Sequence, residues 1–133
     1  MGEGVFKTMD ISASGLNAEW TRMRVIANNV ANAETTETAA GGPYRRRQVL
    51  FRAVMDGLEG VEVTGIVPAG DPPRMVFEPG HPDANAQGYV AMPNVQVPLE
   101  MIDLMTASRA YEANLAAIRN FKQVCEQTIS LLK

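Results

Sequence analysis

Both ends of this 133-residue chain repeat apolar residues in alternating steps of three and four. On an α-helix that spacing places the apolar side chains on one stripe, and over several heptads it is typical of helices packed along a seam. The pattern predicts long amphipathic helices over residues 5–33 and 99–132. Residues 41–98 hold most of the prolines and glycines, which predicts short strands and turns there.

The expected fold class is therefore α+β, with long N- and C-terminal α-helices packed as a coiled coil and a small β-rich insert between them. We expect residues 1–36 to form the first helix of the coiled-coil core, residues 37–98 the β-rich or irregular insert, and residues 99–133 the second helix. The insert has few large apolar residues, so part of the apolar helix surface is expected to need partners. A chain with this layout looks like a subunit that packs against copies of itself.

Composition and charge argue against a nucleic-acid partner and an intrachain disulfide. The formal net charge of −3 gives no electrostatic reason to expect a nucleic-acid partner. Apolar residues make up 46% and aromatic residues only 6%, which favours helix seams built from small side chains. Cys125 is the single cysteine, so no intrachain disulfide is expected.

Neither a membrane span nor a signal peptide is expected. No run of about 18 apolar residues is present, and the first residues lack the basic start of a secretory signal. These general rules predict a cytosolic protein, or one that leaves the cytosol by a route that needs no cleavable signal.

The apolar stripe of the first helix extends over more than three heptads. Its members are Phe6, Met9, Ala13, Leu16, Trp20, Met23, Ala27 and Val30. Gly15 interrupts the helix at a cost of about 1 kcal/mol relative to alanine. It either opens room for a close neighbour or is a tolerated weak position. Asn28, Asn29 and Asn32 crowd the last turn, where they either cap the helix end or hydrogen bond a neighbouring subunit.

The insert is expected to contain strands at residues 44–51, 61–67 and 74–77 and an extended segment at 89–95. Prolines at 93 and 98 exclude a central strand position for that last segment. The cluster of Arg45, Arg46 and Arg47 is interpreted either as a charged, solvated strand edge or as a contact for an acidic partner or polymer.

The second helix, expected to begin after Pro98, carries two adjacent apolar stripes. The first is formed by Leu104, Tyr111, Ile118, Cys125 and Leu132, joined by Met101, Leu115 and Ile129. The second is formed by Ala107, Ala110, Ala117, Phe121 and Val124. Two stripes exceed what one partner helix requires, so the second indicates contact with another subunit or burial in a small bundle. Glu100 and Asp103 fall at the helix start, where acidic residues favour the macrodipole.

No catalytic, cofactor-binding or metal-binding constellation is present in the sequence. His81 is the only histidine and lacks a second ligand at metal-binding spacing. Nucleophile elbows, phosphate-binding loops and dinucleotide fingerprints are missing as well. The expectation is a protein without catalytic residues, metal, cofactor or small-molecule substrate.

Two terminal motifs carry a specific resemblance. Residues 14–18 (SGLNA) and 25–33 (VIANNVANA) resemble the N-terminal motif of bacterial flagellar rod and hook proteins. Residues 100–101 (EM) and 107–114 (ASRAYEAN) resemble the matching C-terminal motif. The likeness covers essentially the whole chain.

The middle of the chain is similar to the proximal rod members of this superfamily. The similar segments are 43–51 (PYRRRQVLF), 76–84 (VFEPGHPDA) and 88–95 (GYVAMPNV), and the short insert fits too. Two departures are the segment 34–42 (ETTETAAGG), where relatives often have a shorter polar turn, and Trp20, which replaces a polar residue.

This resemblance implies a structural subunit of the flagellar basal body. Such a subunit polymerises helically through its terminal helices into the periplasm-spanning rod, which transmits torque and lines the export path of later axial proteins. The implied partners are copies of itself, other proximal rod subunits, the distal rod protein, the rod–MS-ring junction protein, the MS ring and the flagellar type III export apparatus. Export is implied to need no cleaved signal peptide. The terminal segments are implied to be disordered in the monomer and to become a coiled coil on assembly.

The predicted assembly residues lie on the two seams and among the helix-end amides. They are Met9, Leu16, Met23, Asn28, Asn29, Val30, Asn32, Leu104, Tyr111, Asn114, Leu115 and Ile118. One rival interpretation is a soluble coiled-coil adaptor or export chaperone of the flagellar system. Another is a small hydrolase with its site around His81 and Asp83.

Overall fold

A computed structural model describes residues 2–54 and 60–133 of the chain. It contains two long helices and four strands: α1 Gly2–Ala31, β1 Arg47–Val54, β2 Gly60–Pro68, β3 Arg74–Phe77, β4 Tyr89–Met92 and α2 Val97–Leu131. The two terminal helices, with a small antiparallel insert between them in the sequence, confirm the predicted α+β class. None of the described helices is long and apolar enough to cross a membrane.

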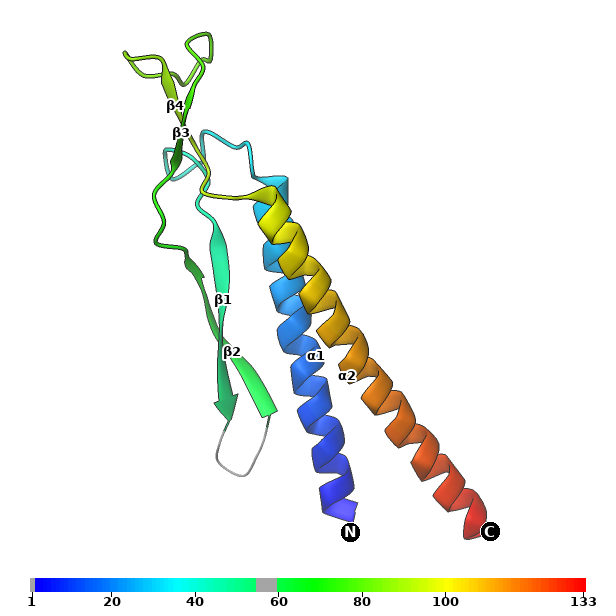
Figure 1. The fold of residues 1–133 in the computed structure, drawn as a ribbon. Coiled ribbons are helices and arrows are strands. Elements are labelled where there is room, and N and C mark those ends of the chain that lie inside the picture. Colours follow the sequence, from blue (N-terminus) through cyan, green and yellow to red (C-terminus); the bar gives the residue numbers. More distant parts are fainter. Residues whose placement is uncertain (1, 55–59) are drawn as a thin grey trace.

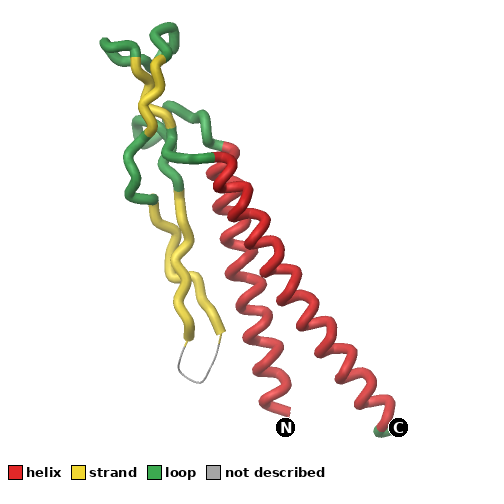
Figure 2. The backbone as a smooth tube through the Cα atoms, viewed as in Figure 1, coloured by secondary structure: helices red, strands yellow, loops and turns green. Residues whose placement is uncertain are grey.

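The elements form an elongated molecule in which α1 lies in the middle. It packs against α2 on one side and against the β1–β2 hairpin on the other (Figure 1). Both termini lie at one end, and the β3–β4 hairpin projects from the opposite end (Figure 2). The helices lie together near the β3–β4 end and diverge toward the termini.

The four strands form two separate antiparallel hairpins. β1 pairs with β2, with Arg47 opposite Pro68, and a register shift between Leu50 and Phe51 adds local twist. β3 pairs with β4, with Phe77 opposite Tyr89. β4 ends directly before Pro93 and pairs with β3 alone, so it has no central strand position.

The predicted elements are present with shifted bounds. β3 has its predicted bounds, whereas β1 begins at Arg47 rather than residue 44 because Tyr44 belongs to the preceding loop. The second helix begins at Val97, so Pro98 lies inside the first turn rather than before it. Proline is tolerated there because a first-turn N–H has no partner within the helix.

The buried face of α1 is rotated from the predicted stripe. Its buried residues are Ala18, Val25, Ile26 and Asn29, whereas the predicted members Phe6, Ala13, Trp20 and Ala27 are exposed. The cause is that α1 contacts two different elements, so its most buried face is the one enclosed between α2 and the hairpin. Heptad spacing alone describes a helix with a single partner.

Candidate assembly surface and buried polar junction

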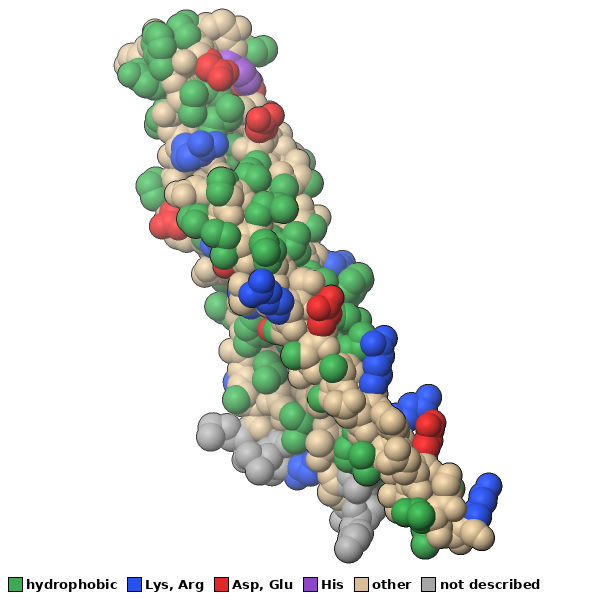
Figure 3. Space-filling view, turned by 45° about the vertical axis from the view of Figure 1, so that its right-hand side comes forward, with side chains coloured by type: hydrophobic (Ala, Val, Ile, Leu, Met, Phe, Trp, Pro, Cys, Tyr) green, Lys and Arg blue, Asp and Glu red, His purple; other side chains and the backbone are tan. Residues whose placement is uncertain are grey.

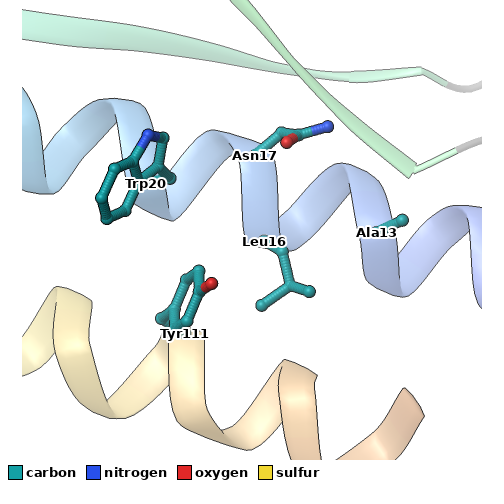
Figure 4. Close-up of a pocket in the computed structure, with 5 residues that line it drawn as sticks. All are labelled: Ala13, Leu16, Asn17, Trp20 and Tyr111. Atoms are coloured by element: carbon teal, nitrogen blue, oxygen red, sulfur yellow. The ribbon is translucent and has the colours of Figure 1, made fainter.

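An aromatic pair, Trp20 of α1 and Tyr111 of α2, joins the two helices at the edge of the seam beside Leu16. The rings of Trp20 and Tyr111 lie 6.4 Å apart at 46°. Together with Ala13 and Asn17 these residues line an open groove of about 350 Å³. In Figure 4, Leu16 points toward α2 beside Tyr111, whereas Asn17 points away from α2 toward the hairpin. The groove shows that the seam is only partly filled within one chain.

Gly15 lies opposite Asn114 of α2. A Cβ atom at Gly15 would come within 2.9 Å of Asn114 Nδ2. The glycine therefore provides room for a side chain of the partner helix, which favours the packing interpretation over the tolerated weak position.

The eight apolar residues predicted for assembly share one degree of burial. Each is neither buried nor fully exposed: Met9, Leu16, Met23, Val30, Leu104, Tyr111, Leu115 and Ile118. Half-burial leaves part of each side chain in contact with solvent. Each of these side chains therefore remains partly open to a further partner.

The three helix-end asparagines have three different environments. Asn29 is fully buried. Asn32 bonds within its own turn, donating to the Asn28 carbonyl at 2.9 Å and accepting from Thr35 at 3.2 Å, which is the capping interpretation. The side chain of Asn28 is exposed. Only Asn28 thus keeps an amide directed to solvent.

Asn29 joins α1 to the loop that leads into β1. Its Oδ1 accepts from the Tyr44 hydroxyl and from the Arg47 N–H, both at 2.9 Å. Its Nδ2 donates to the Arg47 carbonyl at 2.9 Å and to a carboxylate oxygen of Glu100 at 3.1 Å. This pairing satisfies the whole amide, as a buried polar group requires.

Glu100 is the largest fully buried side chain among the described residues. Its carboxylate accepts from Asn29 and from the guanidinium of Arg46, and the same guanidinium lies 3.6 Å from Asp103. The Arg46 N–H in turn donates to Asn94 Oδ1 at 2.7 Å. We call Asn29, Tyr44, Arg46 and Glu100 the polar junction. It ties α1, α2 and the insert together at one point.

The polar junction was not predicted from the sequence. Glu100 was interpreted as a helix-start acid and Arg46 as part of a strand-edge or partner-binding cluster, yet the buried Glu100 carboxylate pairs with the half-buried Arg46 guanidinium. Burial raises the pKa of the Tyr44 phenol as the largest effect, Arg47 opposes this shift, and Glu100 adds to it. The only sequence signal was an acidic residue in a helix whose neighbours at 99 and 101 are apolar.

Large apolar side chains remain exposed on the far half of α2. Val124 and Ile129 are 58% and 57% exposed, and Leu131 is 87% exposed. Hydrophobic side chains also cover much of the upper part of the face drawn in Figure 3. A helix that exposes this much apolar surface is typical of a chain that buries it against partners.

His81 and Asp83 form a local turn. His81 Nδ1 accepts from the Asp83 N–H at 3.0 Å, and the Asp83 carboxylate accepts from the Thr36 hydroxyl at 2.6 Å. Within residues 2–54 and 60–133 no group of three or more potential metal-ligating side chains is present. These contacts give the pair a structural role in holding the 78–88 loop to the loop that follows α1.

Comparison with known families defines the class of protein. Residues 9–37 match the family described as flagella basal body rod protein. Residues 86–131 match the family described as flagellar basal body rod FlgEFG protein C-terminal. The two matches cover most of α1 and all of α2, so the class is that of the flagellar basal-body rod proteins.

Relatives along the whole chain narrow the class. The flagellar basal-body rod protein FlgC of Yersinia enterocolitica is 43% identical, with 92% of this chain and 93% of the relative covered. FlgC of Agrobacterium fabrum is 42% identical over 92% and 91%, and FlgC of Borreliella burgdorferi 35% identical over 98% and 99%. The chain belongs to the FlgC family of flagellar basal-body rod proteins. It is a structural rod subunit of the flagellar basal body and not an enzyme.

Proposed function

We propose that this chain is a proximal rod subunit that polymerises helically through its terminal helices and transmits torque along the rod. The observation that carries the proposal is the apolar surface left open on the helix pair. The predicted seam residues are half-buried, and the far half of α2 exposes Val124, Ile129 and Leu131. Burial of such surface against other subunits supplies the free energy of assembly.

Helical polymerisation follows from the kind of contact this molecule offers. A seam on one side of a long helix pair meets a different surface of the next copy, and such heterologous contacts extend without closing into a ring. In the assembly we propose that the helices complete a coiled coil, with Leu16, Leu104 and Tyr111 as knobs. Many packed side chains along the axis would resist twist, which is the physical basis of torque transmission.

The remaining predicted assembly residues divide by their environment. The exposed amide of Asn28 is free to meet a neighbouring subunit, and Asn114 borders the seam beside Gly15. Asn29 and Asn32 already bond within the chain, so we propose that they act by positioning the end of α1. The division into segments 1–36, 37–98 and 99–133 belongs to the same proposal, with the insert held by the polar junction.

The family supports interaction with other flagellar basal-body components. We propose that these are the other proximal rod subunits, the distal rod protein, the junction protein and the MS ring. Export by the flagellar type III apparatus without a cleaved signal belongs to the same proposal. The adaptor or chaperone alternative is disfavoured because the matched families are rod proteins.

The proposal is tested by placing a charge on the seam. Leu16→Asp or Leu115→Asp buries a carboxylate without a partner, which is unfavourable by several kcal/mol. We expect each variant to be exported but to abolish swimming. Ala86→Asp adds the same charge on an exposed loop of the insert and should swim normally. Normal swimming of both seam variants would refute assembly through the seam.

Hydrogen exchange on the isolated chain tests whether the helices need partners. We expect amides in residues 1–35 and 99–133 to exchange faster than those within the insert, because the seam is incomplete in one copy. Full protection of both helices in a monomer would instead favour a self-contained helix pair, as in the adaptor interpretation.

A further inference from the structure

A second open surface lies on the insert, between the loop after α1 and the end of the hairpin where β1 begins and β2 ends. It is a groove of about 740 Å³ lined by Arg45 and Arg47 and by apolar side chains that include Ala39, Pro43, Ile66 and Pro68. Ile66 is 47% exposed there. The groove is separate from the helix seam, because none of its lining residues belongs to α1 or α2.

The charge of this groove contrasts with that of the chain. The chain has 15 acidic and 12 basic residues, yet the groove is lined by two arginines and by no acidic side chain. Arg46 contacts Glu100, whereas Arg45 and Arg47 are exposed and line the groove. Among the described residues neither of these two guanidinium groups lies in an ion pair.

The spacing of the two arginines defines the ligand. In an extended chain, residues two positions apart are separated by about 7 Å and their side chains point to the same side. Arg45 and Arg47 are two positions apart, and both line the groove. A second extended segment with carboxylates at alternate positions has the same repeat. Successive side chains of such a segment point to opposite sides, so its intervening side chains would face away from Arg45 and Arg47. Arginine binds carboxylates in a planar, bidentate geometry, which favours this pairing.

We propose that this groove binds an extended protein segment with acidic side chains at alternate positions, supplied by another component of the rod. That the partner is a rod component rests on the proposed function. That the groove recognises an alternating acidic segment rests on the groove residues alone. Binding therefore joins the insert to a neighbour at a surface distinct from the helix seam.

The test is an NMR titration of the full chain with synthetic peptides. A nine-residue peptide that alternates valine and glutamate should shift the amides of residues 38–42, 44–47, 66 and 67. It should bind more tightly than the valine–glutamine version by about tenfold, the effect of losing charged hydrogen bonds. A peptide with the same composition but adjacent glutamates should also bind more weakly, because it does not match the two arginines.

Matched variants locate the binding. Arg45→Gln combined with Arg47→Gln should reduce affinity for the alternating peptide by about tenfold. Arg24→Gln combined with Arg52→Gln removes the same charge from exposed positions outside the groove and should leave affinity unchanged.

Three outcomes would overturn the proposal. The first is equal affinity for the alternating and the adjacent glutamate peptides. The second is that the peptide shifts amides outside the groove. The third is that polygalacturonate shifts the groove amides and the peptide does not, which would indicate an acidic polysaccharide as the ligand. Failure of the proposed rod function would appear in the swimming of the seam variants and not in this titration.

Discussion

Asn29 and Glu100 are hydrogen bonded at 3.1 Å although 71 residues separate them in the chain. Asn29 belongs to the last turns of α1, and Glu100 to the first turn of α2. Their contact joins the two helix ends that flank the insert. The two helices are therefore held together at the insert, and they diverge toward the termini (Figure 1).

Loss of Arg46 should destabilise the fold strongly. Arg46→Ala leaves the buried Glu100 carboxylate without its cation, a change that costs about 3–5 kcal/mol for a buried pair. Urea denaturation followed by circular dichroism measures this loss. The double variant Arg46→Met, Glu100→Met should recover much of the lost stability, because apolar side chains can replace a buried ion pair. Equal stability of Arg46→Ala and the unchanged chain would contradict the pairing.

Asn29→Ala should lower the free energy of unfolding, whereas Asn28→Ala should not. The first substitution removes four hydrogen bonds and leaves buried partners unpaired, at about 1–3 kcal/mol for each unpaired group. The second acts at an exposed side chain, where changes stay within about 0.5 kcal/mol. Urea denaturation of the Asn29→Ala and Asn28→Ala variants measures the difference in their free energies of unfolding. Reduced swimming of Asn28→Ala at unchanged stability would support a contact with a neighbouring subunit.

A large side chain at Gly15 should push the helices apart. Gly15→Leu meets the Asn114 side chain, and overpacking of this kind costs about 1–3 kcal/mol. We expect urea denaturation to show a lower free energy of unfolding and its recovery by the second substitution Asn114→Ala, which removes the opposing amide. Gly4→Leu is the matched control, because a Cβ there meets nothing within 4 Å. If the second substitution fails to restore the free energy of unfolding, the close approach does not limit the packing of the helices.

Alkaline pH should destabilise the chain through Tyr44. Burial raises the pKa of its phenol in the folded state, so folding favours the neutral form. The stabilisation is complete below the unfolded pKa of about 10 and is lost as the pH rises through the higher folded pKa. Tyr44→Phe should remove this part of the pH dependence. Denaturation midpoints measured from pH 8 to about 11 test it, and identical slopes for both chains would exclude the effect.

Local patterns predicted the elements well. Heptad spacing located both helices, alternation at residues 61–67 located β2, and the strand predicted at residues 74–77 has the bounds of β3. These signals act between residues close in sequence, so they can be recognised without knowledge of the tertiary structure. The rod motifs in the same helices also pointed to the family that the comparisons show.

The polar junction could not be predicted in this way. Arg46, within a run of three arginines, is indistinguishable by sequence from Arg45 and Arg47, yet it alone bonds Glu100. The apolar stripe predicted for α1 also differs from its buried face, because the helix contacts two elements and buries Val25 and Ile26 instead.

Sequence periodicity by itself determined that the chain ends are helices and the middle is a β-rich insert, because hydrogen bonding and apolar spacing within each element are local. Only the tertiary structure decided which face of α1 is enclosed and which polar side chains are buried. Those outcomes depend on contacts such as Asn29 with Glu100, whose partners are distant in sequence and meet only when helices and insert come together. The free energy of a buried charge depends on those partners and not on its neighbours along the chain.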